Sequence, residues 1–173
     1  MEVHLNRDRI DLRTHRADLT FGTGPLEPQA GFRQRCLADS RTILVAHPGY
    51  LEARGTPLTV SDLRQHDCVM VGSALGWQLR DRHIPIAPRL RFNGFEPARR
   101  AVGARLGIGR FAAAYVAKEL SQGSLKVVLP EETTIATLYA VILGSGRTTP
   151  IQRAFLDLAA KRITTERLLV PGS

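Results

Sequence analysis

The sequence predicts an α/β protein, and three observations support that class. Short β-branched or alternating runs follow one another with helical patterns between them, as in layered α/β proteins. The run 138–143 is apolar throughout, which is typical of a strand covered on both faces of a sheet. The segment 151–163 carries its apolar residues at helical spacing, so it predicts an amphipathic helix that packs against such a sheet.

The first half of the chain predicts mainly strands. Three short runs each stop at a loop signal and are predicted as strands: 18–22, 41–46 and 68–71. An edge or interrupted strand is expected over 84–92, because Pro85 and Pro88 cannot donate to a ladder. A short helix is expected near Thr59 or Ser61, whose hydroxyls can accept from the first free N–H groups.

The second half predicts helices with strands between them. Helices are predicted over 97–106, 112–120 and 151–163, and strands over 125–130 and 138–143. Pro97 suits the first turn of its helix, and Thr149 with Pro150 suits the start of the last one.

Length and composition limit the class further. With 173 residues, 43% of them hydrophobic and 23% charged, the chain can bury the core of one domain or two small lobes. No apolar run approaches the ~20 residues of a membrane helix. The charged N-terminal segment has no apolar region of a secretory signal, so we expect a cytoplasmic protein without a membrane partner. Cys36 and Cys68 belong to no Cys-x-x-Cys pair and predict two buried, free thiols.

The basic charge leaves one alternative open. Lys and Arg total 24 against 16 Asp and Glu, a net charge of +8, and three of the basic residues are lysines. The charge is spread along the chain, which favours a solvated arginine-rich surface. A non-specific nucleic-acid-binding protein is the alternative that this charge allows.

Chemical motifs are few. The histidines never fall at i, i+4 spacing, so no metal site is expected. Gly107, Gly109 and Ala112 fit the Gly-x-Gly-x-x-Ala pattern of a dinucleotide-binding turn, which makes an NAD(P)-binding oxidoreductase fragment a second alternative. The segment before Gly107 reads as a helix, however, whereas that turn must follow a strand. A tight helix-to-strand turn is the simpler interpretation, and no cofactor is expected.

Several short motifs also follow one another in a fixed order. They are 16–22 (Arg-Ala-Asp-Leu-Thr-Phe-Gly), 47–57 (His-Pro-Gly-Tyr-Leu-Glu-Ala-Arg-Gly-Thr-Pro), 62–68 (Asp-Leu-Arg-Gln-His-Asp-Cys), 105–109 (Arg-Leu-Gly-Ile-Gly), 119–130 (Glu-Leu-Ser-Gln-Gly-Ser-Leu-Lys-Val-Val-Leu-Pro) and 154–158 (Ala-Phe-Leu-Asp-Leu). Their order and spacing resemble the effector-binding domain of LysR-type transcriptional regulators over nearly the whole chain. Trp77 stands where a tryptophan is frequent in that family, whereas Arg110 replaces a usually apolar residue and Ala112 a usual proline.

The resemblance implies a two-lobed fold of the type 2 periplasmic-binding-protein class. The first lobe would comprise residues 1–40 with 131–173 and the second residues 41–130, joined by crossover strands near 37–45 and 127–137. The implied function is the sensing of a small, anionic effector between the lobes of an oligomeric regulator, without enzymatic activity. The family's helix-turn-helix, through which it would bind DNA, and the first strand–helix unit of the first lobe are expected to be missing. The first lobe is therefore expected to be truncated and incomplete.

Six residues are candidate effector ligands. Thr23 and Ser73 are hydroxyl residues that follow predicted strands, at positions where the resemblance places effector contacts. Asn6 and Trp77 are further candidates, and Arg110 and Arg147 could each hold a carboxylate through a guanidinium. The alternatives are hydroxyls that only close turns and arginines that only face solvent. The binding hypothesis requires Thr23 and Ser73 to face one common cleft.

Overall fold

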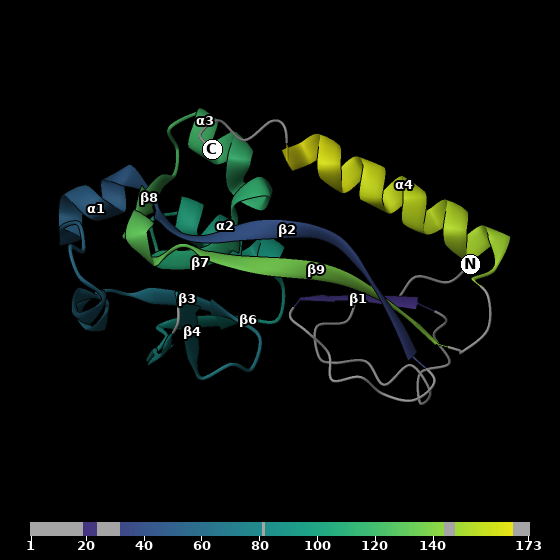
Figure 1. Cartoon of the computed structure of the whole chain (residues 1–173). Coiled ribbons are helices and arrows are strands. Elements are labelled where there is room, and N and C mark those ends of the chain that lie inside the picture. Colours follow the sequence, from purple (N-terminus) through teal and green to yellow (C-terminus); the bar gives the residue numbers. More distant parts are fainter. Residues whose placement is uncertain (1–18, 24–31, 81, 144–147, 168–173) are drawn as a thin grey trace. The chain divides into compact units, whose positions relative to one another are not determined.

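The computed structural model describes residues 19–23, 32–80, 82–143 and 148–167. The chain divides into two compact units, residues 1–40 with 136–173 (unit 1) and residues 41–135 (unit 2). Two long strands, β2 (Phe32–Ala46) and β9 (Thr134–Leu143), contribute residues to both units (Figure 1). The chain therefore passes from one unit to the other within strands, at residues 40–41 and 135–136.

Unit 1 packs one helix against strands. Strand β1 (Leu19–Thr23) pairs antiparallel with β9, and helix α4 (Pro150–Arg167) follows β9. A small core forms around Ala140, Ile142 and Leu156. Helix α4 begins as predicted, because the Thr149 hydroxyl accepts from the Gln152 N–H and the Gln152 side chain accepts from the Thr149 N–H.

Unit 2 is built on a mixed sheet. The end of β2 pairs antiparallel with β7 (Ile108–Ala112) and with β8 (Lys126–Val128). Strand β3 (Cys68–Val71) pairs parallel with both β7 and β6 (Leu90–Phe92). A separate hairpin joins β4 (Gly76–Leu79) and β5 (Arg82–Pro85). The helical elements of this unit are α1 (Pro48–Arg54), η1 (Val60–Gln65), α2 (Phe95–Gly103), η2 (Ala113–Val116), α3 (Ala117–Ser121) and η3 (Pro130–Glu132).

The sheet of unit 2 is buried on both faces. One buried cluster, called cluster A here, takes Leu44, Met70 and Ile108 from the three central strands. The alternate residues of the same strands belong to a second cluster, in which Phe111 packs with α2. Both faces are therefore covered, which explains why these strands read as near-continuous apolar runs.

The structure departs from the sequence-based expectations in several places. Cys68 is buried as expected, but Cys36 is exposed because it lies on a solvent-exposed stretch of β2. Strand β4 was not expected. The expected strand 84–92 is two strands, β5 and β6, separated by a proline-containing break. The expected helix 112–120 divides into η2 and α3. Helix α1 was missed because His-Pro-Gly reads as a loop. Its first turn is instead capped by the His47 imidazole, whose Nδ1 accepts from the Gly49 N–H at 2.9 Å.

The glycine turn joins helix α2 to strand β7. Gly107 has φ +147°, and a Cβ atom there would overlap the carbonyl oxygen of Asp67. The Ile108 N–H donates to that same carbonyl at 2.9 Å, which holds the turn against the start of β3. A dinucleotide-binding turn runs from strand to helix, the opposite order. The expected helix-to-strand turn is thus present, and the dinucleotide alternative has no support.

Gly107 is expected to be essential for stability. The substitution Gly107→Ala should lower the free energy of unfolding by about 2 kcal/mol or more, because it adds both backbone strain and overlap with Asp67. Gly103→Ala is the matched control, since nothing lies within 4 Å of a Cβ at this helical position. It should be neutral or raise stability by about 0.5 kcal/mol. Urea unfolding of both variants tests this, and equal stability of the two would contradict it.

A carboxylate at the start of α2 gives a second prediction. Hydrogen bonds from Arg100, Arg99 and Tyr115 lower the pKa of Glu96 from 4.5 to about 2. A lowered pKa in the folded state adds stability that is present above the unfolded-state value and is lost as the pH falls through the folded-state value. The stability difference between wild type and Glu96→Gln should therefore be full at neutral pH and shrink between about pH 4.5 and about pH 2. Urea unfolding across this range measures it, and a pH-independent difference would show that the ion pairs contribute nothing.

Candidate functional site

Three parallel strands bring several loops to one edge of the unit 2 sheet. In β3, β6 and β7 the carboxyl ends point the same way, with Val71 opposite Phe92 and Val69 opposite Gly109. Ligands of α/β proteins bind outside the carboxyl ends of such strands. The loop after β3, the start of α2 and the start of η2 all lie at this edge, here called the carboxyl edge.

Ser73 lies in the loop that follows β3. The Gly72 N–H donates to the carbonyl of Phe92 at 2.8 Å, which ties the loop to β6. The Arg91 guanidinium donates to the carbonyls of Gly72 and Ala74, both at 2.7 Å. These bonds fix the backbone on both sides of Ser73, whose own side chain is exposed. The loop therefore presents a free hydroxyl from a fixed backbone.

Arg110 is a positively charged residue in the middle of strand β7. It lies on β7 opposite Leu44, on the face that carries cluster A. One guanidinium nitrogen, Nη2, donates to the Thr134 hydroxyl at 2.8 Å, while Nε is buried and has no partner among the described residues. Burial lowers the pKa of Arg110, and no carboxylate of the described segments forms an ion pair with it. A partly buried cation without a counter-charge is costly, and an anionic ligand would supply that charge.

Trp77 serves the core. Its side chain is 5% exposed and packs in cluster A with Leu79 and Ile86. Most of the indole ring therefore packs in the core and stabilises the hairpin. Contact between Trp77 and an effector stays a prediction.

The other predicted ligands lie beyond what the structure describes in full. Thr23 ends β1 opposite Leu138 in unit 1, and its backbone alone is described. Asn6 and Arg147 fall outside the described residues. The common cleft of Thr23 and Ser73 accordingly stays a prediction, whereas Ser73 follows the parallel strand β3 and Arg110 lies on its neighbour β7.

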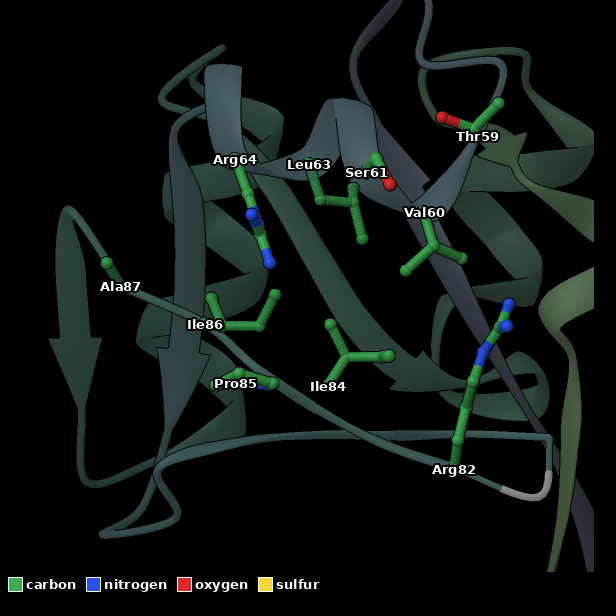
Figure 2. A pocket seen from close by; sticks show the side chains of 10 residues that line it. All are labelled: Thr59, Val60, Ser61, Leu63, Arg64, Arg82, Ile84, Pro85, Ile86 and Ala87. Atoms are coloured by element: carbon green, nitrogen blue, oxygen red, sulfur yellow. The ribbon is translucent and has the colours of Figure 1, made fainter.

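Sequence reasoning missed two features of unit 2. The first is Thr134, the partner of Arg110, which lies 24 residues away along the chain. The second is a cavity of about 790 Å³ between η1 and β5 (Figure 2). Neither has a local sequence signal, since each forms only when distant segments pack. Among the described residues, no group of three His, Cys, Asp or Glu side chains could hold a metal ion. Within the same segments, no helix combines the length and the apolar character needed to span a bilayer.

Comparison with known families gives one match over most of the chain. The family model described as the LysR substrate binding domain matches residues 1–164. The transcriptional regulator CrgA of Neisseria meningitidis serogroup C is 28% identical over 162 residues, covering 89% of this chain and 54% of CrgA. A regulator of the helix-turn-helix type from Xanthomonas campestris is 28% identical over 177 residues, covering 94% of this chain and 51% of its own length. The chain thus spans about half the length of the curated relatives it matches.

Solved structures agree with this match. The regulatory domain of CrgA superposes with a TM-score of 0.77 at 26% identity, covering 91% of this chain and 80% of that domain. The full-length virulence activator AphB of Vibrio cholerae gives a TM-score of 0.73 at 24% identity, over 91% of this chain and 55% of AphB. The fold is therefore the two-lobed, type 2 periplasmic-binding-like fold of these regulatory domains, as predicted.

The cost of the unpaired charge of Arg110 to the free energy of unfolding can be measured. Arg110→Met keeps the length of the side chain and removes the charge, so it should raise the free energy of unfolding by about 1 kcal/mol in the absence of ligand. Arg91→Met is the contrasting variant, because it removes two hydrogen bonds to loop carbonyls and should lower stability by about 1 kcal/mol. Both values come from urea unfolding. A loss of stability in Arg110→Met as large as in Arg91→Met would mean that Arg110 serves the fold.

Proposed function

Because the chain belongs to the LysR substrate-binding domain family, we propose that it senses a small anionic effector with the carboxyl edge of unit 2 as part of the binding site. The family's domain is an effector-binding regulatory domain and not an enzyme. The observation that supports an anion is the Arg110 guanidinium, which is partly buried, bonded to Thr134 and free of any described carboxylate.

Each group of the edge has a role in this proposal. Arg110 binds a carboxylate or similar group, because a planar guanidinium matches two oxygens at once. Ser73 donates its hydroxyl from the loop that Arg91 holds. Helix α2 begins at Gly94, after the parallel strand β6, and no side chain caps its first free N–H groups, so its positive end also favours an anion at this edge. Thr23, Asn6, Trp77 and Arg147 remain further proposed contacts.

The regulatory output follows from the relatives. They are transcriptional regulators of the helix-turn-helix type, and we propose that effector binding here shifts the balance between two arrangements of an oligomeric cytoplasmic regulator. The effector can shift that balance only by its difference in affinity for the two arrangements. DNA contact would belong to a helix-turn-helix domain of the regulator.

The anion preference can be tested with a ligand panel. Small aliphatic and aromatic carboxylates, each paired with its neutral amide, are added to the full chain and the melting temperature is recorded. Carboxylates are expected to raise it by binding the folded state, and the amides are not. Titration calorimetry then gives the affinity of any carboxylate that binds.

Substitutions locate the site. Arg110→Met should weaken a bound carboxylate by about 10- to 100-fold, because a charge-assisted contact is lost, and Arg110→Lys should weaken it less. Arg153→Gln, which removes an exposed arginine of α4, is the control with the same change of charge. Equal affinities of Arg110→Met and wild type, or equal responses to acid and amide, would contradict the proposal.

A further inference from the structure

The cavity between η1 and β5 lies apart from the residues assigned to the carboxyl edge. Its lining comes from η1, from β5 and from the residues just after β5, and all of it belongs to unit 2. The lining residues are Thr59, Val60, Ser61, Leu63, Arg64, Arg82, Ile84, Pro85, Ile86 and Ala87 (Figure 2). None of them is among the residues assigned to the effector, and a volume of about 790 Å³ is in the range of small-molecule sites.

One wall of this cavity is apolar and firmly supported. Leu63 and Ile86 are buried members of cluster A, and Val60 and Ile84 pack against that cluster while still facing the cavity. A wall that continues into a close-packed core keeps its shape when empty. It is therefore ready to bury an apolar body without reorganisation.

The charges around the wall are unequal. Arg82 is neutralised, because its guanidinium donates to the buried carboxylate of Glu132 at 2.7 Å. Arg64 has neither a hydrogen bond nor an ion pair with any described residue. Asp62, its neighbour on η1, accepts instead from the N–H groups of Leu58 and Thr59. The cavity thus has one uncompensated positive charge.

The polar groups surround the apolar wall. In Figure 2 the Arg64 and Arg82 side chains extend from η1 and from β5 toward the space between these elements, and Ser61 lies on η1 beside Val60. A ligand seated on Val60, Ile84 and the core residues behind them would therefore have its polar end within reach of Arg64.

We propose that this cavity is a second ligand site, for a monocarboxylate with a compact apolar body. The apolar body lies on the wall formed by Val60, Leu63, Ile84 and Ile86, and the carboxylate pairs with Arg64 while Ser61 donates to it. One negative charge matches the one unpaired arginine, and Glu132 holds Arg82 at the rim. None of the lining residues of this site is assigned to the effector, although Ile84 pairs across the hairpin with Trp77, a proposed effector contact.

The test uses 2-naphthoate as the probe and its neutral amide as the comparison. The isotope-labelled full chain is titrated with 2-naphthoate to millimolar concentration while backbone amide signals are followed by NMR. Saturable shifts are expected for residues of η1 and for residues 84–87, and weaker ones with the amide. Absence of saturable shifts at η1 and residues 84–87, or equal affinity for the amide at these residues, would overturn the proposal, whatever shifts binding at the carboxyl edge produces.

Variants separate this site from the effector site. Arg64→Gln should weaken 2-naphthoate by about 5- to 10-fold, the loss expected for a partly solvated charged hydrogen bond. Ser61→Trp should abolish binding by filling the cavity from an exposed position, so that folding, checked by circular dichroism, is preserved. Arg153→Gln and Arg110→Met should leave the probe's affinity unchanged. If Arg64→Gln binds like wild type, or if Arg110→Met alone loses the probe, the second site is refuted whatever the outcome at the carboxyl edge.

Discussion

Burial of strand β7 on both faces is the constraint on which the rest of unit 2 depends. The strand lies between β2 and β3, with Ile108 on the face of cluster A and Phe111 on the face covered by α2. Even Gly109 is confined, because a Cβ there would overlap Phe111 and Val102. Arg110, between two buried residues of this strand, is itself only partly exposed. Arg110 is thus a charged residue that the fold itself does not require, which is the pattern expected of a residue kept for function.

The parts of the fold that could be predicted from sequence are those with a local cause. Strand β3 and helix α4 were predicted from their own residues, with Thr149 as the cap of α4. The Gly107 turn was also predicted, because positive φ beside a neighbouring backbone leaves room for glycine alone. Each of these features depends on a few consecutive residues, so a short segment of sequence is enough to predict it.

The remaining features depend on distant segments. The β4–β5 hairpin was missed because its cause is the close approach of Gly76 to the carbonyl of Ile84, which no periodicity signals. Trp77 was predicted as a ligand contact on family grounds, whereas its burial follows from the hairpin folding onto cluster A. Arg110 was singled out because it replaces a usually apolar residue of the family and was expected in a loop-like turn; it lies in strand β7 instead, and its role as a ligand stays a prediction. Its partner Thr134 and the cavity beside η1 could not be singled out, since both arise from tertiary packing.

Ion pairs account for part of the arginine-rich composition of unit 2. Arg82 pairs with Glu132 and Arg89 with Asp67, while Arg99 and Arg100 share Glu96. Such pairs at the surface add little stability each, but they also neutralise charge locally. These pairs offset part of the net charge of +8, and the family match gives no support to a nucleic-acid-binding role for this chain. Arg64 and Arg110 form no ion pair with the described residues, and their positions set them apart: Arg64 lines the cavity and Arg110 lies within strand β7.

These two cations lie against the same core. The cavity wall beside Arg64 includes Leu63 and Ile86 of cluster A, and Arg110 lies on the sheet face that carries Ile108 of that cluster. A close-packed cluster has few voids, so a displacement at one side requires its neighbours to move. Any coupling between a ligand at Arg64 and one at Arg110 would have to pass through these shared contacts. Linkage makes such coupling reciprocal: a carboxylate in the cavity that strengthened effector binding would itself bind more tightly once the effector was in place.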